Sequence, residues 1–221
     1  MKKIILASCF SLLSLGAFAQ LEIGVKVTPN LGWNRIDGSN ESAGYEGDGS
    51  RMHLNGGLVL DKFFGDNYAF STGLLLATKG GTLSYPLLGT SIQSVDIMNQ
   101  YLEIPVSLKL YTNEVAPDIK AYFQLGGAFG FLTAAKIDGE KNIDIDGPGG
   151  NETEKATKSF NTVELSALLG AGIEYQLGES TKVFTGLAFQ HGLTDISDKK
   201  LGGDDLSMKN SMLGLDFGIK F

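Results

Sequence analysis

The sequence predicts an all-β protein, an eight-stranded antiparallel up-and-down transmembrane β-barrel. Segments with strict apolar and polar alternation recur eight times, and the last of them, 211–221, runs to a terminal aromatic residue, Phe221. The polar face of these segments is rich in glycine, which suits the narrow interior of an eight-stranded barrel. Short and long connections alternate between the segments, as they do in barrels that cross a membrane.

The first 19 residues have the features of a secretory signal peptide. Lys2 and Lys3 precede an apolar run, and an A-x-A cleavage site ends at Ala19. The run is shorter than the roughly 20 residues that a spanning helix needs. Cys9 lies too early in the chain to be the lipid-modified residue of a lipoprotein. We therefore expect a signal peptide over 1–19 and one barrel domain over 20–221, which contains no cysteine after cleavage.

Each expected strand places large apolar side chains on one face and small, polar or charged ones on the other. The apolar face is predicted to face lipid and the polar face the lumen. In chain order, with one outward and one inward residue each, the strands are 21–34 (Val25, Lys26), 51–61 (Leu58, Asp61), 68–79 (Leu76, Lys79), 98–111 (Leu108, Lys109), 119–132 (Leu125, Gln124), 160–176 (Ile173, Glu174), 182–194 (Leu187, Gln190) and 211–221 (Phe217, Asp216).

The connections predict which ends of the strands lie together. Turn-forming residues such as Gly65, Pro117 and Gly178 occur in the three short connections. The long polar connections join the opposite ends of the strands, so both termini should lie at the short-turn end. The short connections are 62–67, 112–118 and 177–181, and the long ones are 35–50, 80–97, 133–159 and 195–207.

A soluble lipocalin-like barrel or a β-sandwich has the same period with the apolar face turned inward. Aromatic residues near the expected strand ends favour the membrane, because such residues gather at its two interfaces. In lipid the sheet must also close, since an open edge leaves backbone groups unpaired. The aromatic residues are Trp33, Tyr68, Phe131, Tyr175 and Phe221.

Within the fourth strand, Pro105 lacks a ladder hydrogen bond, and we expect a bulge or register change there.

Charges of both signs fall on the expected inward face. Side chains just fill an eight-stranded barrel, so we expect these charges to pair and plug the lumen. The alternative is a narrow path for a solute or proton. The expected lumen charge network is Glu22, Lys26, Arg51, Asp61, Lys79, Glu103, Lys109, Glu164, Glu174, Asp216 and Lys220. A second expected set is the assembly signal of the last strand, Leu213, Leu215, Phe217, Ile219 and Phe221.

The sequence gives no catalytic constellation and no reason to expect a cofactor. Lipid A deacylase barrels use a His-x-Ser pair on the outer wall, but Leu193 follows His191 at the serine position. His53 is expected to be a bonded lumen residue. The segment 142–154 begins like a calcium-binding EF-hand loop, although Asn142 replaces the first aspartate and Thr153 the bidentate glutamate. We interpret it as an acidic loop, with a calcium site as the alternative.

Residues 100–110, Q-Y-L-E-I-P-V-S-L-K-L, resemble the Y-L-E-I-P-x-x-x-K motif of the PorT-like outer-membrane β-barrel family of Bacteroidetes. The segment from Gly24 to Trp33 is similar to that family's first strand, and the A-F-A-Q cleavage region is typical of it. The resemblance implies an eight-stranded barrel in the cell outer membrane. Some members are linked to protein secretion and gliding, which makes an accessory role in secretion one alternative.

The expected function is that of a structural or interaction barrel with long extracellular loops. After cleavage 18 − 2 = 16 basic residues face 25 acidic ones, a net charge of 16 − 25 = −9, which argues against a nucleic-acid partner. Expected partners are outer-membrane lipid, the barrel-assembly machinery and an extracellular partner. The rival classes are a narrow solute-conducting barrel, a membrane-embedded hydrolase and a soluble lipid carrier.

Overall fold

The protein is described from a computed structural model that covers residues 21–36, 44–86, 92–144, 153–198 and 207–221. The expected signal peptide and its cleavage site lie outside the described residues. The described elements are β1 (Leu21–Ile36), β2 (Glu46–Gly65), β3 (Tyr68–Lys79), β4 (Gly81–Pro86), β5 (Ile92–Ala116), β6 (Ile119–Ile137), β7 (Asn142–Asp144), β8 (Thr153–Lys155), the 3-10 helix η2 (Ala156–Ser159), β9 (Val163–Gln176), β10 (Lys182–Gly192) and β11 (Met208–Lys220).

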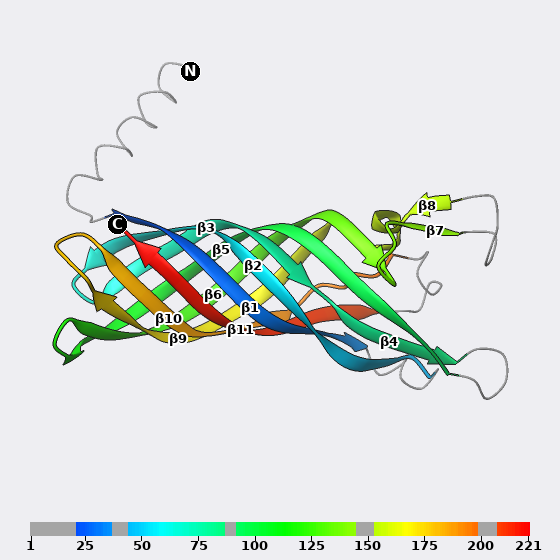
Figure 1. Cartoon of the computed structure of the whole chain (residues 1–221), viewed down its shortest axis with the longest axis horizontal. Helices are drawn as coiled ribbons and strands as arrows, with labels where there is room; N and C mark the ends of the chain where they lie inside the picture. Colours follow the sequence, from blue (N-terminus) through cyan, green and yellow to red (C-terminus); the bar gives the residue numbers. More distant parts are fainter. Residues whose placement is uncertain (1–20, 37–43, 87–91, 145–152, 199–206) are drawn as a thin grey trace, which may run out of the picture.

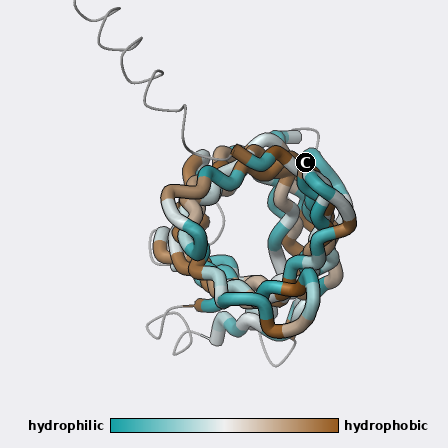
Figure 2. The backbone as a smooth tube through the Cα atoms, turned by 90° about the vertical axis from the view of Figure 1, so that its left-hand side faces the viewer, coloured by the Kyte–Doolittle hydropathy of each residue, from teal (hydrophilic) through white to brown (hydrophobic). Residues whose placement is uncertain are grey.

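Eight strands close into a ring, so the predicted antiparallel up-and-down barrel is confirmed. Each of β1, β2, β3, β5, β6, β9, β10 and β11 pairs with the next, and β1 pairs with β11 to close the sheet (Figures 1 and 2). On β1, Leu31 lies opposite Leu213 on one side and Met52 on the other. Closure leaves no open edge along the ring, which is the condition for a sheet to exist in lipid.

The strands extend further at the long-loop end than the sequence predicted. Gly80, at φ 143°, separates β3 from β4, and such a positive φ favours glycine. β4 then pairs with β2 and with β5 in a stretch that was expected to be a loop. β7, β8 and η2 also lie within the expected loop 133–159. The expected connections 35–50, 62–67, 80–97, 112–118 and 133–159 are therefore partly regular structure, and the expected strand 160–176 begins only at Val163, which are corrections to the sequence-based prediction.

Pro105 causes no register change, contrary to the expectation. Thr72 pairs with Val106 and Leu75 with Glu103, which is the same register on both sides of the proline. The hydroxyl of Thr72 donates a hydrogen bond to the carbonyl oxygen of Pro105, at 2.8 Å. The irregularities between β5 and β6 lie elsewhere, the first of them at Tyr101.

The described ends of the chain meet at the short-turn end, as predicted. Ile23 and Phe221 exchange two backbone hydrogen bonds there, of 3.1 and 2.8 Å. The connections from β2 to β3, β5 to β6 and β9 to β10 lie at the same end, whereas β4, β7 and β8 lie at the other (Figure 1). The barrel axis therefore has a short-turn end and a long-loop end.

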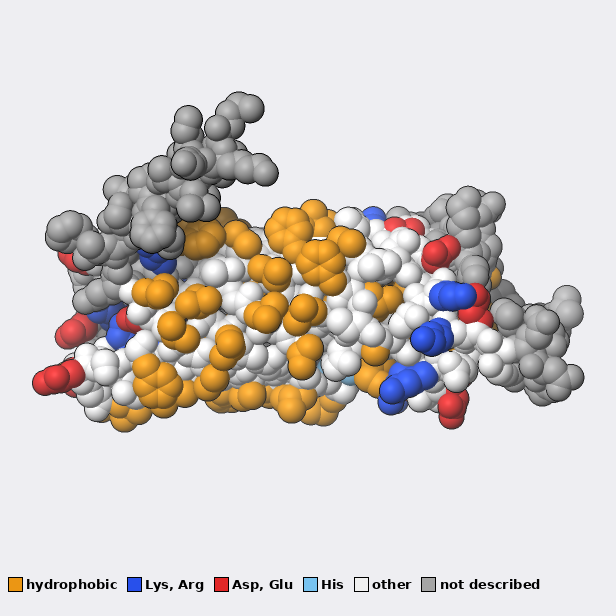
Figure 3. Space-filling view, turned by 90° about the horizontal axis from the view of Figure 1, so that it is seen from above, with side chains coloured by type: hydrophobic (Ala, Val, Ile, Leu, Met, Phe, Trp, Pro, Cys, Tyr) orange, Lys and Arg blue, Asp and Glu red, His pale blue; other side chains and the backbone are white. Residues whose placement is uncertain are grey.

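A band of apolar side chains surrounds the outer wall. Figure 3 shows it on one face, with charged side chains beyond it at both ends. Members on every barrel strand are exposed, which in water would make an unusually large apolar surface. Among the described residues, no helix is long and apolar enough to cross a membrane. The band includes Val27, Leu58, Leu74, Leu108, Phe129, Leu169, Leu187 and Leu215.

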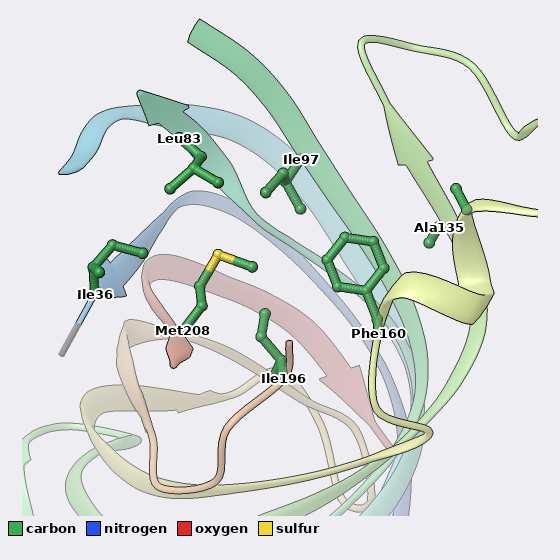
Figure 4. Close-up of a cluster of buried hydrophobic side chains, with 8 residues drawn as sticks. Ile36, Leu83, Ile97, Ala135, Phe160, Ile196 and Met208 are labelled. Carbon is green, nitrogen blue, oxygen red and sulfur yellow. The ribbon is translucent and has the colours of Figure 1, made fainter. Parts of the chain in front are cut away.

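The lumen changes character along its axis. Inward side chains are mostly polar or charged over most of its length, but at the long-loop end they are apolar (Figure 4). Ile36 and Met208 lie opposite each other on β1 and β11, and Phe160 after η2 belongs to the same buried cluster, as does Ile196. We call this cluster the apolar cap. Its members are Ile36, Leu83, Ile97, Ala135, Ala156, Phe160, Ile196 and Met208.

Candidate functional site: the lumen of the barrel

The structure places ten of the eleven expected inward charges in the barrel interior. They form a cluster at the short-turn end, a pair in the middle and a triad below the apolar cap. The short-turn cluster contains Glu22, Asp61, Lys109, Glu174 and Lys220. The middle pair is Lys26 and Asp216, and the triad is Lys79, Glu103 and Glu164.

Lys220 is the centre of the short-turn cluster. Its side chain is fully buried, and its ammonium nitrogen lies 2.6 Å from Glu174, 2.8 Å from Asp61 and 2.9 Å from Glu22. Lys109 binds the same oxygen of Asp61, at 2.8 Å. These contacts connect β2, β5, β9, β11 and the start of β1 across the lumen.

The charges of this cluster balance. Lys182, which is not part of the expected network, binds Glu22, so three lysines face three carboxylates. The hydroxyl of Tyr111 adds a hydrogen bond to Glu174, at 2.6 Å. Buried charges are stable in protein only when they are paired and hydrogen-bonded. Every charge of this cluster is paired, and one oxygen of Glu22 has its ion pair with Lys220 but no hydrogen bond.

Aromatic rings fill the space around the short-turn cluster. Tyr122 and Phe184 are buried inside the barrel, and the ammonium group of Lys109 lies 5.2 and 5.5 Å from the centres of their rings. Inward glycines make room for them. A Cβ atom at Gly172 would lie 2.6 Å from the Tyr122 ring, and one at Gly218 would overlap the Phe184 ring. Cations and rings together leave this end of the lumen packed.

The middle of the lumen holds one ion pair beside a small cavity. Lys26 lies 3.1 Å from Asp216, whose other oxygen accepts a 2.6 Å hydrogen bond from Thr28. The neighbouring cavity, lined by Gln124 and Gln190 among others, has about 20 Å³ available to water centres. That is room for about one water molecule. The cavity is far too small for a sugar or an amino acid.

The triad lies between this cavity and the apolar cap. The ammonium nitrogen of Lys79 lies 2.7 Å from Glu103 and 3.5 Å from Glu164, and the three side chains are almost completely buried. Gln190 donates a 2.7 Å hydrogen bond to Glu103. Glu103 and Glu164 both lie opposite Gly130 on β6, which has no side chain to separate them. One cation therefore serves two carboxylates.

Several polar atoms around the triad lack a hydrogen-bond partner within the described structure. They include one oxygen of Glu164 and both amide atoms of Asn99, which is fully buried. Asn210 contacts Glu164 and the hydroxyl of Tyr101, at 3.3 and 3.4 Å. The triad is thus less completely satisfied than the short-turn cluster.

Arg51 is a correction to the expected network. Its side chain is 51% exposed and binds Asp96 and Thr82, away from the buried charges. His53 is partly buried, and its ring nitrogen lies 3.4 Å from the carbonyl oxygen of Gly80. Neither contact involves the buried carboxylates.

His191 and the segment 142–154 are the remaining candidates for catalysis or metal binding. His191 packs at 6.0 Å against Phe189 on β10, with Leu193 exposed beyond it. In the segment 142–154, Asn142 and Asp144 belong to β7, which pairs with β8, and 145–152 lie outside the described residues. Within the described part of the chain, no three His, Cys, Asp or Glu residues are grouped to hold a metal ion.

Sequence reasoning missed several lumen residues that its own pattern contains. Tyr111 and Lys109 have the same parity on β5, and Tyr122 and Gln124 have the same parity on β6, so alternation places both tyrosines inward. Asn210 precedes the expected start of its strand at 211 but belongs to β11. The five residues of the expected assembly signal lie on the outer face of β11 and just after it, at the short-turn end.

Comparisons with solved structures find β-barrels at low sequence identity. Neisserial surface protein A is 8% identical, with 90% of this chain and 95% of that chain covered and a TM-score of 0.49. The outer membrane protein OprG from Pseudomonas aeruginosa is 13% identical, with 91% and 94% covered and a TM-score of 0.48. The attachment invasion locus protein Ail of Yersinia pestis, in complex with a heparin analogue, is 16% identical, with 90% and 99% covered and a TM-score of 0.40.

No curated protein matches the sequence. The model of the family described as "Outer membrane protein beta-barrel domain" matches residues 18–198, most of the chain. This match agrees with the closed eight-stranded ring and its exposed apolar band. The chain therefore belongs to the outer-membrane β-barrel domain family.

Proposed function

We propose that this outer-membrane barrel is a closed structural and interaction protein, which holds long extracellular hairpins in place and conducts no solute. The observation that carries the proposal is the filling of the lumen. Two buried ion clusters, a middle ion pair and the apolar cap follow one another along the axis. A hydrated solute would have to break buried ion pairs to pass, at several kcal/mol each.

The proposal includes the finer expectations from the sequence. The chain is made with a signal peptide that is cleaved near Ala19, and it resembles PorT-like barrels of Bacteroidetes through Tyr101-Leu102-Glu103-Ile104-Pro105. The barrel-assembly machinery inserts it through the apolar face of β11, and the hairpins at the long-loop end meet an extracellular partner. We propose no catalytic role and no cofactor. An accessory role in secretion is the alternative within the same family resemblance.

Liposome swelling tests the closed state. Liposomes that contain the folded protein are diluted into solutions of small sugars and amino acids, with a general porin as the positive control. The proposal expects swelling no faster than in protein-free liposomes. Swelling at a rate that depends on solute size would show a passage and would make the narrow conducting barrel the better function.

A further inference from the structure

The triad in the upper lumen contains one ammonium group for two carboxyl groups. No more than 2% of the side chain of Lys79, Glu103 or Glu164 is exposed, and the apolar cap lies on one side of the three. A carboxylate that is buried without a counter-charge is costly, whereas a neutral carboxyl group is much less so. If both glutamates were ionised, one of the two negative charges would have no cation of its own.

The two carboxyl groups of the triad have different surroundings. One oxygen of Glu103 lies 2.7 Å from the ammonium nitrogen of Lys79, and the other accepts a 2.7 Å hydrogen bond from Gln190. One oxygen of Glu164 lies 3.5 Å from Lys79 and 3.3 Å from the amide nitrogen of Asn210. Its other oxygen has no hydrogen-bond partner among the described residues. Glu103 is therefore the closer partner of Lys79, and Glu164 holds the surplus carboxyl group.

The triad also lies among buried oxygens that lack a hydrogen-bond donor. Asn99 on β5 is directly opposite Lys79 on β3, it is fully buried, and its side-chain oxygen has no partner in the described part of the chain. The side-chain oxygen of Gln190 is in the same situation. An ionised carboxylate can only accept hydrogen bonds, whereas a protonated one also donates. A proton on Glu164 would remove the unbalanced charge and add a donor where acceptors are in excess.

The other groups near Glu164 cannot take the place of that proton. Glu164 is influenced by the charges of Lys79 and Glu103, and the phenol of Tyr101 is the further titratable group beside it. Lys26, the cation of the middle pair, binds Asp216. The uncharged neighbours of the triad are Asn34 on β1, Gly130 on β6, Gln190 on β10 and Asn210 on β11.

We propose that the triad is a proton-binding site, in which Glu164 holds one proton and Glu103 forms the ion pair with Lys79. The triad then has one charge of each sign, like the middle pair of Lys26 and Asp216. In the unfolded chain Glu164 is an ordinary carboxylate without a proton at neutral pH. The folded barrel therefore binds one proton more than the unfolded chain, and its stability should fall as the pH rises through neutrality.

Infrared spectroscopy of the folded protein tests whether the proton is present. The protein is held at neutral pH in lauryldimethylamine oxide, a detergent without carbonyl groups, and a protonated carboxyl group absorbs above the amide band. We expect such a band in the unmodified protein and none in Glu164→Gln. Glu103→Gln should lose it too, because Glu164 then becomes the one carboxylate beside Lys79 and ionises. Glu174→Gln is the matched control, since Glu174 is also buried but belongs to the cluster with equal numbers of lysines and carboxylates. It should keep the band.

The frequency of the band tells which glutamate holds the proton, because it depends on the hydrogen bonds of that carboxyl group. Asn210→Leu removes the donor to Glu164 and should shift the band, whereas Gln190→Met removes the donor to Glu103 and should not. A shift in Gln190→Met alone would place the proton on Glu103 and overturn the assignment. Absence of the band from the unmodified protein, or its persistence in Glu164→Gln, would overturn the site itself.

Urea titration at several pH values around neutrality measures the same proton without spectroscopy. Heat-modifiable mobility first verifies that each variant is folded. Relative to Glu164→Gln, the folding equilibrium constant of the unmodified protein should fall by up to about tenfold per pH unit as the pH rises. His53 and His191 titrate in both proteins, so the difference isolates Glu164. Equal pH dependence of the two proteins would contradict the proposal. Neither measurement depends on whether the lumen conducts, so this test is separate from that of the closed state.

Discussion

Lys79 lies between two carboxylates, so the triad has one ammonium group for two carboxylates. This ratio determines how much stability the loss of either kind of group costs. Glu103 and Glu164 are both within 3.5 Å of its ammonium nitrogen, and all three side chains are almost completely buried. The short-turn cluster has three ammonium groups and three carboxylates, whereas the triad has one surplus carboxylate. In the triad, loss of the one cation should therefore lower the free energy of unfolding more than loss of one carboxylate, whereas the short-turn cluster should show no such difference.

Lys79→Met should destabilise the barrel far more than Glu103→Leu. Without Lys79 two carboxylates stay buried with no counter-charge, a change that costs about 3–5 kcal/mol for a buried pair. Without Glu103, Lys79 keeps Glu164 at 3.5 Å, so the full penalty of an unpaired buried cation is not incurred. The free energy of unfolding is measured by urea titration of the protein folded in lipid vesicles.

Lys62→Met is the matched control for the triad, because Lys62 is exposed on the outer face of β2. It should change the free energy of unfolding by less than about 1 kcal/mol. If Glu103→Leu proved as destabilising as Lys79→Met, the surplus-charge account of the triad would be wrong.

The sequence predicts on which face a residue lies, but it cannot predict which residues pair. Strict alternation placed Lys109, Glu174 and Lys220 inward, and the structure has them there. Their meeting across the lumen depends on the register of three strands, which no local pattern contains. Arg51 has the inward parity of β2, but its side chain is half exposed and pairs with Asp96 on β5, apart from the buried charges, which alternation alone does not predict.

At the scale of single strands, β1 and β11 show why the long-loop end was harder to predict. The inward face of β1 begins with Glu22 and ends with Ile36, and that of β11 begins with Met208 and ends with Lys220. Inside the membrane the outer wall faces lipid, and the polar groups turn inward. Beyond the membrane the outer wall faces water, so the apolar side chains turn inward and form the cap. Along one strand, the inward positions are therefore polar inside the membrane and apolar beyond it.

Phe221→Asp should reduce the amount of inserted barrel. Phe221 is exposed after β11 and ends the apolar face that we propose as the assembly signal. A carboxylate there interrupts this face where the chain ends. The amount of heat-modifiable protein in the outer-membrane fraction measures insertion. Phe64→Asp is the control, because Phe64 is exposed at the same end of the barrel but belongs to β2. Equal levels of Phe221→Asp and Phe64→Asp would argue against a C-terminal signal.

Phe160→Ala should open the apolar cap and leave the ring of strands intact. Phe160 is 3% exposed and packs in the cap beside Ile196, and removal of a buried phenylalanine ring costs about 3–5 kcal/mol. Hydrogen exchange should become faster at the amides of Asn161 and Ile196, which bond within the cap. The amide of Leu187 in β10 should keep its protection. Phe129→Ala, on the lipid-facing wall, should change neither cap amide, and protection of both in Phe160→Ala would contradict this account.

At the scale of the whole molecule, the barrel is a stack of layers inside one closed sheet. From the short-turn end these are the balanced ion cluster with its aromatic rings, the middle pair with its small cavity, the triad and the apolar cap. The ring could be predicted from eight alternating segments. The cap could not, because it combines residues of five strands with η2, Phe160 and the segment around Ile196, which are far apart in sequence.

Single-channel recording in planar bilayers tests the closed lumen most directly. The unmodified protein, shown to be folded by its heat-modifiable mobility, is reconstituted and held at potentials of both signs. The account predicts a baseline that does not differ from that of the protein-free bilayer, because ion pairs and the cap fill the lumen from end to end. Large, stable, porin-like conductance steps would contradict it and would move the function toward solute passage.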